Sequence, residues 1–230
     1  MSLPFSRSEL IYENPLTNNG DIADFVMEGD AVLSFLNGRL RMENTLDPAL
    51  GQKSNFVFWC EQELPDNVCV SWEFWPIREP GLAMLFFSAR AENGKSIFDP
   101  ALKPRAGIYD QYHDGDINAL HVSYFRRKHP RERAFCTCNL RKSRGFHLVA
   151  QGADPIPNVA DAEPPYTLTL WKVGPRVIFS VAQADEEIHA IDWTDDGVSY
   201  GPVLTGGYFG FRQMAPLIGE YTNLRVWKVG

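Results

Sequence analysis

The sequence predicts an all-β protein, a sandwich of two antiparallel sheets, and three observations lead to this fold class. Apolar residues recur with a period of two along most of the chain, as in strands that bury one face. Aromatic residues make up 13% of the 230 residues, and they favour pleated, half-buried surfaces. The 18 glycines and 16 prolines supply turns between the apolar runs. No low-complexity linker or internal repeat divides the chain, so we expect residues 1–230 to form a single β-sandwich domain.

Individual strands can be assigned in chain order, after a short turn around Asp47–Gly51 that is the nearest approach to a helix. In residues 68–75 the even-numbered positions, Val68 to Phe74, share one face of a strand. Residues 82–89 are apolar on both faces, which indicates a central strand. Further strands are expected at 121–127, 133–141, 146–151, 166–173, 176–183, 207–213 and 221–229. Gly174 and Pro175 predict a tight hairpin, and we expect the last strand to pair with an early one.

Charge and cysteine content limit the partners and the compartment. The chain has 22 Lys and Arg against 29 Asp and Glu, a net charge of −7, which argues against nucleic acid or an anionic membrane as a partner. The sequence has no signal-peptide core at its N-terminus and no membrane-spanning run of about 18 apolar residues. Of four cysteines, Cys136 and Cys138 share one strand face, and none has zinc or redox Cys-x-x-Cys spacing. We therefore expect buried thiols in a cytoplasmic protein.

The strongest functional clue is a reversal of charge between Arg126 and Arg144, inside a His- and Tyr-rich stretch at 109–157. If neighbouring strands present these side chains on one concave face, they form a cationic groove with an aromatic floor. Such a groove suits a sugar acid, because Arg binds a carboxylate through two hydrogen bonds and aromatic rings pack against sugar rings. The predicted ligand-binding residues are Trp72, Glu73, Tyr112, Arg126, Asn139, His147 and Arg212. The alternative is a solvated basic edge that prevents aggregation between strands.

The same stretch contains the residue types that elimination from a uronate requires: a group that neutralises the carboxylate, a base for the C5 proton and an acid for the leaving oxygen. His121, Tyr124 and Arg141 are the candidate catalytic residues, and the alternative for His121 is a hydrogen-bonded core histidine. A hydrolase would need two facing carboxylates, of which Glu73 is one candidate. The Glu-x-Asp-x-x-Glu motif of sandwich-fold glucanases does not occur, which disfavours that route.

No cofactor is predicted. Residues 114–118 read Asp-Gly-Asp-Ile-Asn, like the opening of a calcium loop, but Ala119 and Phe125 stand where an EF-hand needs Gly and Glu. A structural Ca²⁺ at this turn stays open as an alternative to a polar hairpin. The His and Cys spacings do not suit zinc, and the glycine-rich phosphate-binding motifs are absent from the sequence.

Four stretches resemble the YesU-like family, which is catalogued as a domain of unknown function. They are DGDINALHVSYFRR, CNLRKSRGFHLVAQGADPIP, GYFGFRQM and YTNLRVWKV. The resemblance extends from Tyr12 to Val229, and it implies a concanavalin A-like jelly roll with one concave sheet. The family's namesake belongs to a cluster of pectin (rhamnogalacturonan) breakdown functions, and relatives of the fold include lectins, glucanases and polysaccharide lyases. A shared fold does not establish a reaction, so no catalytic residue is carried over.

Three functions follow as hypotheses. The first is an intracellular protein that binds, and in an enzymatic version processes as a lyase, an oligosaccharide containing uronates of the pectin type. The second is a non-catalytic lectin-like or assembly module, whose apolar sheet faces would allow a homodimer. The third is a two-carboxylate glycoside hydrolase that uses Glu73.

Overall fold

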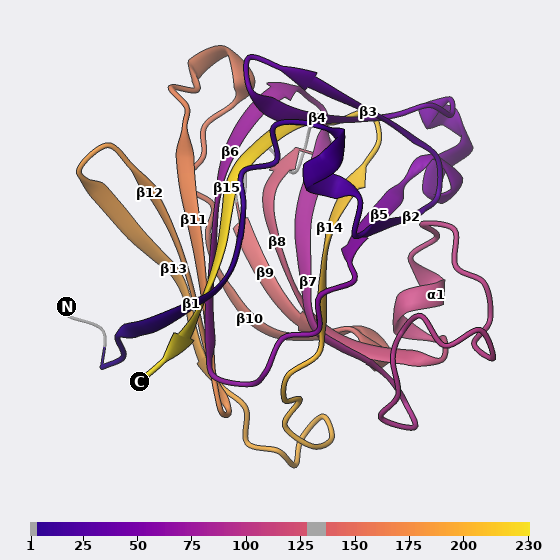
Figure 1. Cartoon of the computed structure of the whole chain (residues 1–230), viewed down its shortest axis with the longest axis vertical. Coiled ribbons are helices and arrows are strands. Elements are labelled where there is room, and N and C mark those ends of the chain that lie inside the picture. The colour runs from indigo at the N-terminus through magenta and orange to yellow at the C-terminus, as the bar shows by residue number, and fades with distance from the viewer. Residues whose placement is uncertain (1–3, 128–136) are drawn as a thin grey trace.

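The structure is a computed structural model that describes residues 4–127 and 137–230. It confirms the predicted all-β fold, because these residues form an eight-stranded and a seven-stranded antiparallel sheet packed face to face (Figure 1). The predicted strand at 133–141 is described from Thr137 onward, and Cys136 lies outside the described residues.

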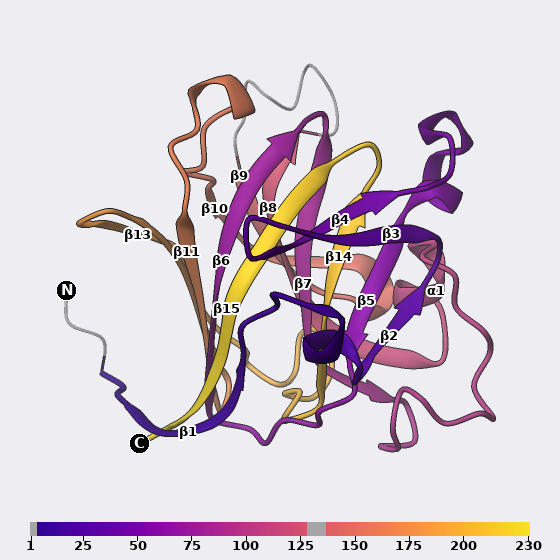
Figure 2. The same cartoon turned by 45° about the horizontal axis from the view of Figure 1, so that its top comes forward.

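The eight-stranded sheet contains, in spatial order, β13 (Glu186–Thr194), β12 (Arg176–Gln183), β11 (Tyr166–Val173), β6 (Val68–Arg78), β15 (Ile218–Val229), β4 (Arg39–Asn44) and β3 (Ala31–Leu36). The eighth strand, β1 (Arg7–Asn14), pairs with the C-terminal half of β15, which places the two chain ends close together (Figures 1 and 2). The expectation that the last strand pairs with an early one is therefore confirmed. The hairpin predicted at Gly174 and Pro175 joins β11 to β12.

The seven-stranded sheet runs in the order β10 (His147–Ala153), β9 (Thr137–Lys142), β8 (Ile117–Arg127), β7 (Gly81–Ala91), β14 (Tyr208–Met214), β5 (Phe56–Cys60) and β2 (Phe25–Glu28). The connections contain the short helices η1 (Asn19–Ile22), η2 (Pro48–Ser54), α1 (Asp110–His113), η4 (Arg144–Phe146) and η5 (Val159–Asp161). Helix η2 corresponds to the turn expected around residues 47–51. Strands β1 to β5 and β13 were not predicted, since most are short and only partly buried.

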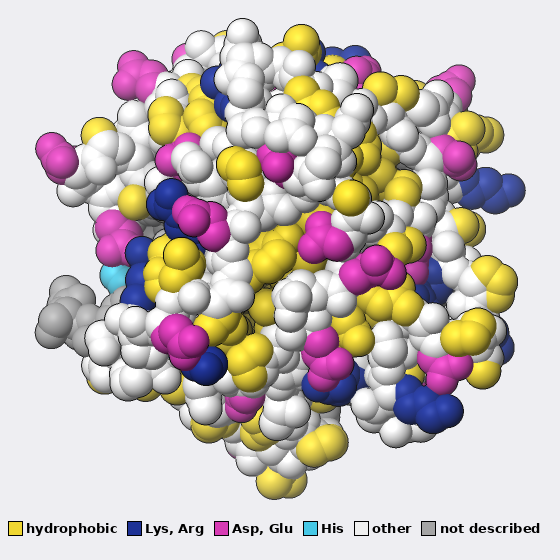
Figure 3. Space-filling view, viewed as in Figure 1, with side chains coloured by type: hydrophobic (Ala, Val, Ile, Leu, Met, Phe, Trp, Pro, Cys, Tyr) yellow, Lys and Arg dark blue, Asp and Glu magenta, His cyan; other side chains and the backbone are white. Residues whose placement is uncertain are grey.

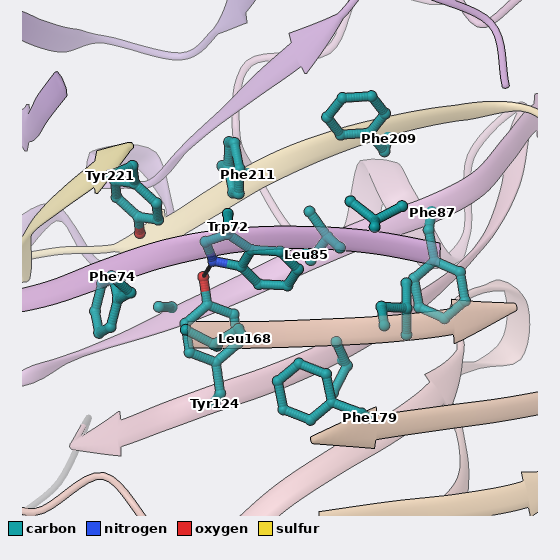
Figure 4. Packing of buried hydrophobic residues seen from close by; sticks show 14 of the residues in the cluster. Trp72, Phe74, Leu85, Phe87, Tyr124, Leu168, Phe179, Phe209, Phe211 and Tyr221 are labelled. Carbon is teal, nitrogen blue, oxygen red and sulfur yellow. Dashed lines mark hydrogen bonds between the residues drawn. The ribbon is translucent and has the colours of Figure 1, made fainter. Parts of the chain in front are cut away.

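The main core lies between the two sheets and follows the period-two pattern of the sequence. Val68, Val70, Trp72 and Phe74 of β6 are all buried there, as their shared face predicted. Phe211 of the facing sheet packs edge-on against Trp72, with ring centroids 5.8 Å apart (Figure 4). Aromatic contacts of this kind make the space between the sheets a dry, close-packed layer.

The outer face of the seven-stranded sheet is the face turned away from this core. Residues 92–116 connect β7 to β8 and fold over part of this face, and we call them the covering segment. They build a second apolar cluster in which Tyr112 of α1 packs on Phe86 and Trp59, at centroid distances of 5.4 and 6.4 Å. Helix α1 also contacts β8 and η4, and the rings of His113 and Phe146 lie 5.5 Å apart. The covering segment therefore occupies one half of the outer face and reaches β8 and η4 at its border.

Candidate functional site

Strand register brings the polar residues of the basic stretch together on the uncovered half of the outer face. Arg141 of β9 lies opposite His121 of β8, and Asn139 lies opposite Ser123. Residues directly opposite each other in an antiparallel pair point to the same face, and so do residues two apart on one strand. The four side chains therefore form a compact square on one surface.

A pocket of about 230 Å³ lies over this square. Its lining comes from β7, β8, β9 and β14 together with the covering segment, η2 and η4. The lining residues are Gln52, Leu82, Met84, Tyr109, His121, Ser123, Arg126, Asn139, Arg141, Phe146 and Met214. The residues combine apolar walls with a few convergent polar groups, which is the usual composition of a small-molecule site.

The pocket is basic although the chain is acidic. Arg126 and Arg141 line it, and none of the described lining residues is Asp or Glu. Elsewhere, on the face seen in Figure 3, acidic and basic side chains are interspersed. The local excess of positive charge therefore favours an anionic ligand in this pocket.

His121 is the most constrained polar residue of the pocket. Its side chain is buried, with Nε2 2.8 Å from the Tyr109 hydroxyl and Nδ1 2.8 Å from Ser143 Oγ. Burial lowers the pKa of His121 well below its ordinary value, and the guanidinium groups of Arg141 and Arg212 lower it further. The imidazole is therefore neutral at neutral pH.

Tyr109 completes this pair from the covering segment. Burial raises the pKa of its phenol above the ordinary value, while Arg212, Arg141 and Arg126 act in the opposite direction. The phenol is therefore protonated at neutral pH, and three cations surround it. It can donate a proton or a hydrogen bond to a group bound in the pocket.

Arg141 is held in position by η4. Its Nη1 donates to the Phe146 carbonyl at 3.0 Å, and its guanidinium lies 4.0 Å from the centre of the Phe146 ring. These contacts use one donor and one face of the guanidinium. The planar group has five N–H donors, so it can still bind a carboxylate through two of them.

Asn139, which lies opposite Ser123, also contacts Arg126. Its amide group is 2.7 Å from the Gln151 amide on β10 and 3.0 Å from Arg126 Nη1. Arg126 Nη1 also donates to Thr137 Oγ1 at 3.0 Å. These contacts fix the guanidinium of Arg126 beside the pocket.

Arg212 lies beneath the pocket rather than in it. Its side chain is fully buried, and it donates to the Gly107 carbonyl at 2.6 Å and to Gln52 Oε1 at 3.1 Å. Its guanidinium also faces the Tyr109 and Tyr112 rings, at 5.2 and 5.5 Å. Arg212 adds positive charge below the pocket but does not reach a ligand directly.

Two predicted site residues, Trp72 and Tyr124, are instead core residues, and these predictions were wrong. Both side chains are fully buried between the sheets, where Trp72 Nε1 donates to the Tyr124 hydroxyl at 3.2 Å (Figure 4). The physical reason is the regular alternation of β8, which places Tyr124, three residues after His121, on the opposite face of the strand. Tyr124 cannot act as a catalytic residue in the pocket.

Three further predicted ligand-binding residues lie outside the pocket. Glu73 is on the outward face of the eight-stranded sheet, where it accepts a hydrogen bond from Asn223 at 2.8 Å. Tyr112 belongs to the covering segment and is buried against the sheet, where its hydroxyl donates to Glu28 at 2.7 Å. His147 points away from Arg141 and stacks on Tyr200, with centroids 4.5 Å apart. Glu73, the carboxylate of the hydrolase hypothesis, is therefore on the other sheet from this pocket.

The sequence reasoning missed Tyr109, Gln52, Phe146 and the apolar lining from Leu82, Met84 and Met214. Tyr109 and Phe146 were visible in the basic stretch, but their positions depend on how the covering segment and η4 fold. Gln52 comes from a distant part of the chain and has no local signal.

The structure does not support a metal site at the predicted turn. Asp116 accepts a hydrogen bond from the Lys103 amide at 2.9 Å and pairs with the Lys103 side chain. No cluster of three His, Cys, Asp or Glu side chains suited to a metal ion is found in residues 4–127 and 137–230. Cys60, Cys69 and Cys138 are buried and free. Over the same described ranges, no helix is both long and apolar enough to cross a membrane.

Comparison with known proteins gives a family match and several similar structures. The model of the domain of unknown function DUF1961 matches residues 9–226. Uncharacterized protein YesU of Bacillus subtilis (strain 168) is 49% identical over 222 residues, 96% of this chain and 97% of that protein. The crystal structure of a Bacillus subtilis protein of unknown function with a galectin-like fold has a TM-score of 0.92 at 48% identity, covering 98% of both chains. The Ca²⁺/Man3GlcNAc-bound exoplasmic/lumenal domain of VIP36 has a TM-score of 0.60 at 11% identity, covering 96% of this chain and 90% of that one. This last match shows a common fold alone.

Proposed function

For this chain, which belongs to the DUF1961 family as its YesU-like motifs predicted, we propose that it binds an oligosaccharide that contains uronate residues. The single observation that carries the proposal is the basic pocket on the outer face of the seven-stranded sheet, with Arg126 and Arg141 in its lining and no acidic side chain among its described residues. The jelly-roll fold that it shares with sugar-bound VIP36 supports a sugar over another small anion.

The chemistry of the pocket matches the two halves of a uronate. Arg141 and Arg126 supply guanidinium donors for the carboxylate, and hydrogen bonds to charged groups contribute about 1.5–3 kcal/mol each. Ser123 and Asn139 supply neutral hydrogen-bonding groups for hydroxyls. The Tyr109 and Phe146 rings, 5.4 Å apart and edge to face, provide apolar surface for the C–H face of the ring.

The Tyr109–His121 pair favours a second candidate, elimination from the bound uronate. In that reaction a base removes the C5 proton, the C4–O bond breaks, a C4=C5 double bond forms, and the leaving oxygen takes up a proton. The neutral His121 and the protonated Tyr109 lie 2.8 Å apart at the pocket, and the arginines would stabilise the charge that develops on the carboxylate. Turnover is measured from the absorbance of the unsaturated product. Loss of turnover in Tyr109→Phe with binding retained would support this candidate, and no turnover by the parent chain on any acidic oligosaccharide would leave binding alone.

Binding itself is tested by calorimetric titration with a trigalacturonate and with the neutral galactose trisaccharide. We expect binding of the acidic sugar to be at least about tenfold tighter, because only the acidic sugar can use the arginine donors. Arg141→Gln should weaken binding of the acidic sugar by about 10- to 150-fold, the effect of losing a charge-assisted interaction.

The matched control is Arg225→Gln, which removes an exposed arginine paired with Glu13 on the other sheet. We expect this variant to bind the acidic sugar as the parent chain does. Equal affinity for acidic and neutral sugars, or no binding of either, would contradict the proposal and leave the assembly-module hypothesis. The homodimer and the cytoplasmic location stay predictions.

A further inference from the structure

We infer that the pocket takes the end of an acidic oligosaccharide, and that the rest of the chain leaves across β10. This inference rests on the proposed function and adds which part of the sugar chain is recognised. It follows from how the covering segment divides the outer face.

The row of residues that begins in the pocket is blocked at its middle. Across the sheet, register places Leu148, Arg141, His121, Phe86, Gly210 and Trp59 in one line. Arg141 and His121 line the pocket, with Leu148 one strand further out, but Phe86 and Trp59 are fully buried beneath the covering segment. Gly210 is required in this line, because a Cβ there would lie 2.6 Å from the Trp59 ring. A bound chain cannot continue along this row beyond His121.

The covering segment is fixed in place by buried polar contacts. Arg105 forms an ion pair with Glu28 at 2.6 Å, and both side chains are less than 10% exposed. The Gly107 carbonyl accepts from the buried Arg212, and the Gly107 amide donates to the Tyr112 hydroxyl at 3.1 Å. Because a buried charge that loses its partner is strongly destabilising, these contacts hold the covering segment against the sheet.

The size of the pocket agrees with a chain end. A volume of about 230 Å³ is below the roughly 300–1,000 Å³ of pockets that enclose drug-sized ligands. It therefore accommodates about one sugar residue, and the next residue must lie outside.

The exposed side chains show where the next residue lies. Phe146 is 46% exposed and Leu148 is 43% exposed, and Leu148 lies opposite Arg141 in the register of β10 and β9. β10 is the edge strand of the seven-stranded sheet, opposite in the strand order to β2 (Figures 1 and 2). These two side chains give the second sugar residue an apolar surface directly beside the pocket.

The inference is tested by measuring binding capacity against polygalacturonate before and after partial hydrolysis, at equal uronate mass. If the protein binds ends, capacity rises in proportion to the number of chain ends. If capacity is the same before and after hydrolysis, the protein binds internal residues and the inference is wrong, while the proposed function stands. If the protein binds none of the three, the polymer, its fragments or trigalacturonate, the proposed function itself fails.

The exit path is tested with Leu148→Glu, which puts a negative charge beside the expected second residue. We expect about fivefold to tenfold weaker binding of trigalacturonate, from charge repulsion and lost apolar contact, with binding of monomeric galacturonate unchanged. The control is Leu36→Glu, at a similarly exposed leucine on β3 of the other sheet, 41% exposed, which should bind both as the parent does. If Leu148→Glu binds trigalacturonate as tightly as the parent does, the path across β10 is wrong.

Discussion

Replacing His121 by Gln should make the stability of the protein less sensitive to acid. The imidazole is 1% exposed, lies within 2.8 Å of both Tyr109 and Ser143, and shares its surroundings with the guanidinium groups of Arg141 and Arg212. These conditions lower its pKa in the folded state well below the ordinary value near 6.5. In the unfolded chain the same group takes up a proton as the pH falls through that ordinary value.

The sign and size follow from proton linkage. Below about pH 6.5 the unfolded state binds one more proton at this site than the folded state, so acid favours unfolding. Each pH unit changes the free energy of unfolding by at most about 1.36 kcal/mol per proton, so the loss between pH 7 and pH 5 is at most about 2 kcal/mol. Well above pH 6.5 the imidazole is neutral in both states, so this acid-dependent loss of stability is absent there.

Urea unfolding at pH 7 and pH 5 measures this difference. We expect the parent chain to lose more stability than His121→Gln over this range, by up to about 2 kcal/mol, whatever the absolute stability of the variant. His189→Gln, at a partly exposed histidine of β13, controls for the loss of one imidazole. An equal loss in the parent and in His121→Gln would show that His121 is not a buried neutral histidine, and the reasoning about the pocket's electrostatics would be wrong.

Two further predictions concern the covering segment. Glu28→Gln should lower the free energy of unfolding by about 3–5 kcal/mol in urea titrations, because Arg105 would be left buried without its counter-charge. The control is Glu9→Gln, at a residue paired with Lys228 on the surface, which should lower it by at most about 1 kcal/mol. Gly107→Ala should lower the free energy of unfolding by several kcal/mol in the same assay, since its Cβ would lie 2.0 Å from the Asn55 carbonyl oxygen. The control is Gly94→Ala: Gly94 has φ at 78°, close to the 77° of Gly107, but no neighbour within 4 Å of its Cβ position, so this variant should cost only about 1–2 kcal/mol. Equal costs within either pair would contradict the close packing of this segment.

Local alternation made the fold class readable from the sequence. Val68 to Phe74 alternate because one face of β6 is buried, so this strand and its core face could be predicted without any knowledge of its neighbours. The short strands β2 to β4 gave no such signal, because they pack on the margins of the sheets with partly exposed side chains. β2 and β4 are placed by pairing with β5 and β15, and β3 is placed by pairing with β4.

The basic stretch was also readable as a functional clue, but the sequence could not assign its faces. Tyr124 and His121 are three residues apart on one strand, so alternation sends one to the core and the other to the pocket. The bulge at Phe125 then places Arg126 on the pocket face, which the alternation alone does not predict. Glu73 and Trp72 seemed suited to a sugar site from their composition, yet β6 belongs to the other sheet.

The sequence by itself determined that this protein is an aromatic-rich β-sandwich with a basic stretch in an acidic chain, because alternation and charge are properties of neighbouring residues. Only the tertiary structure decided that His121, Asn139 and Arg141 share a pocket, that Arg212 lies beneath it and that residues 92–116 close one side of it. These facts depend on cross-strand register and on the path of a long connection over the sheet. Both are set by contacts between residues far apart in the chain, which no local pattern encodes.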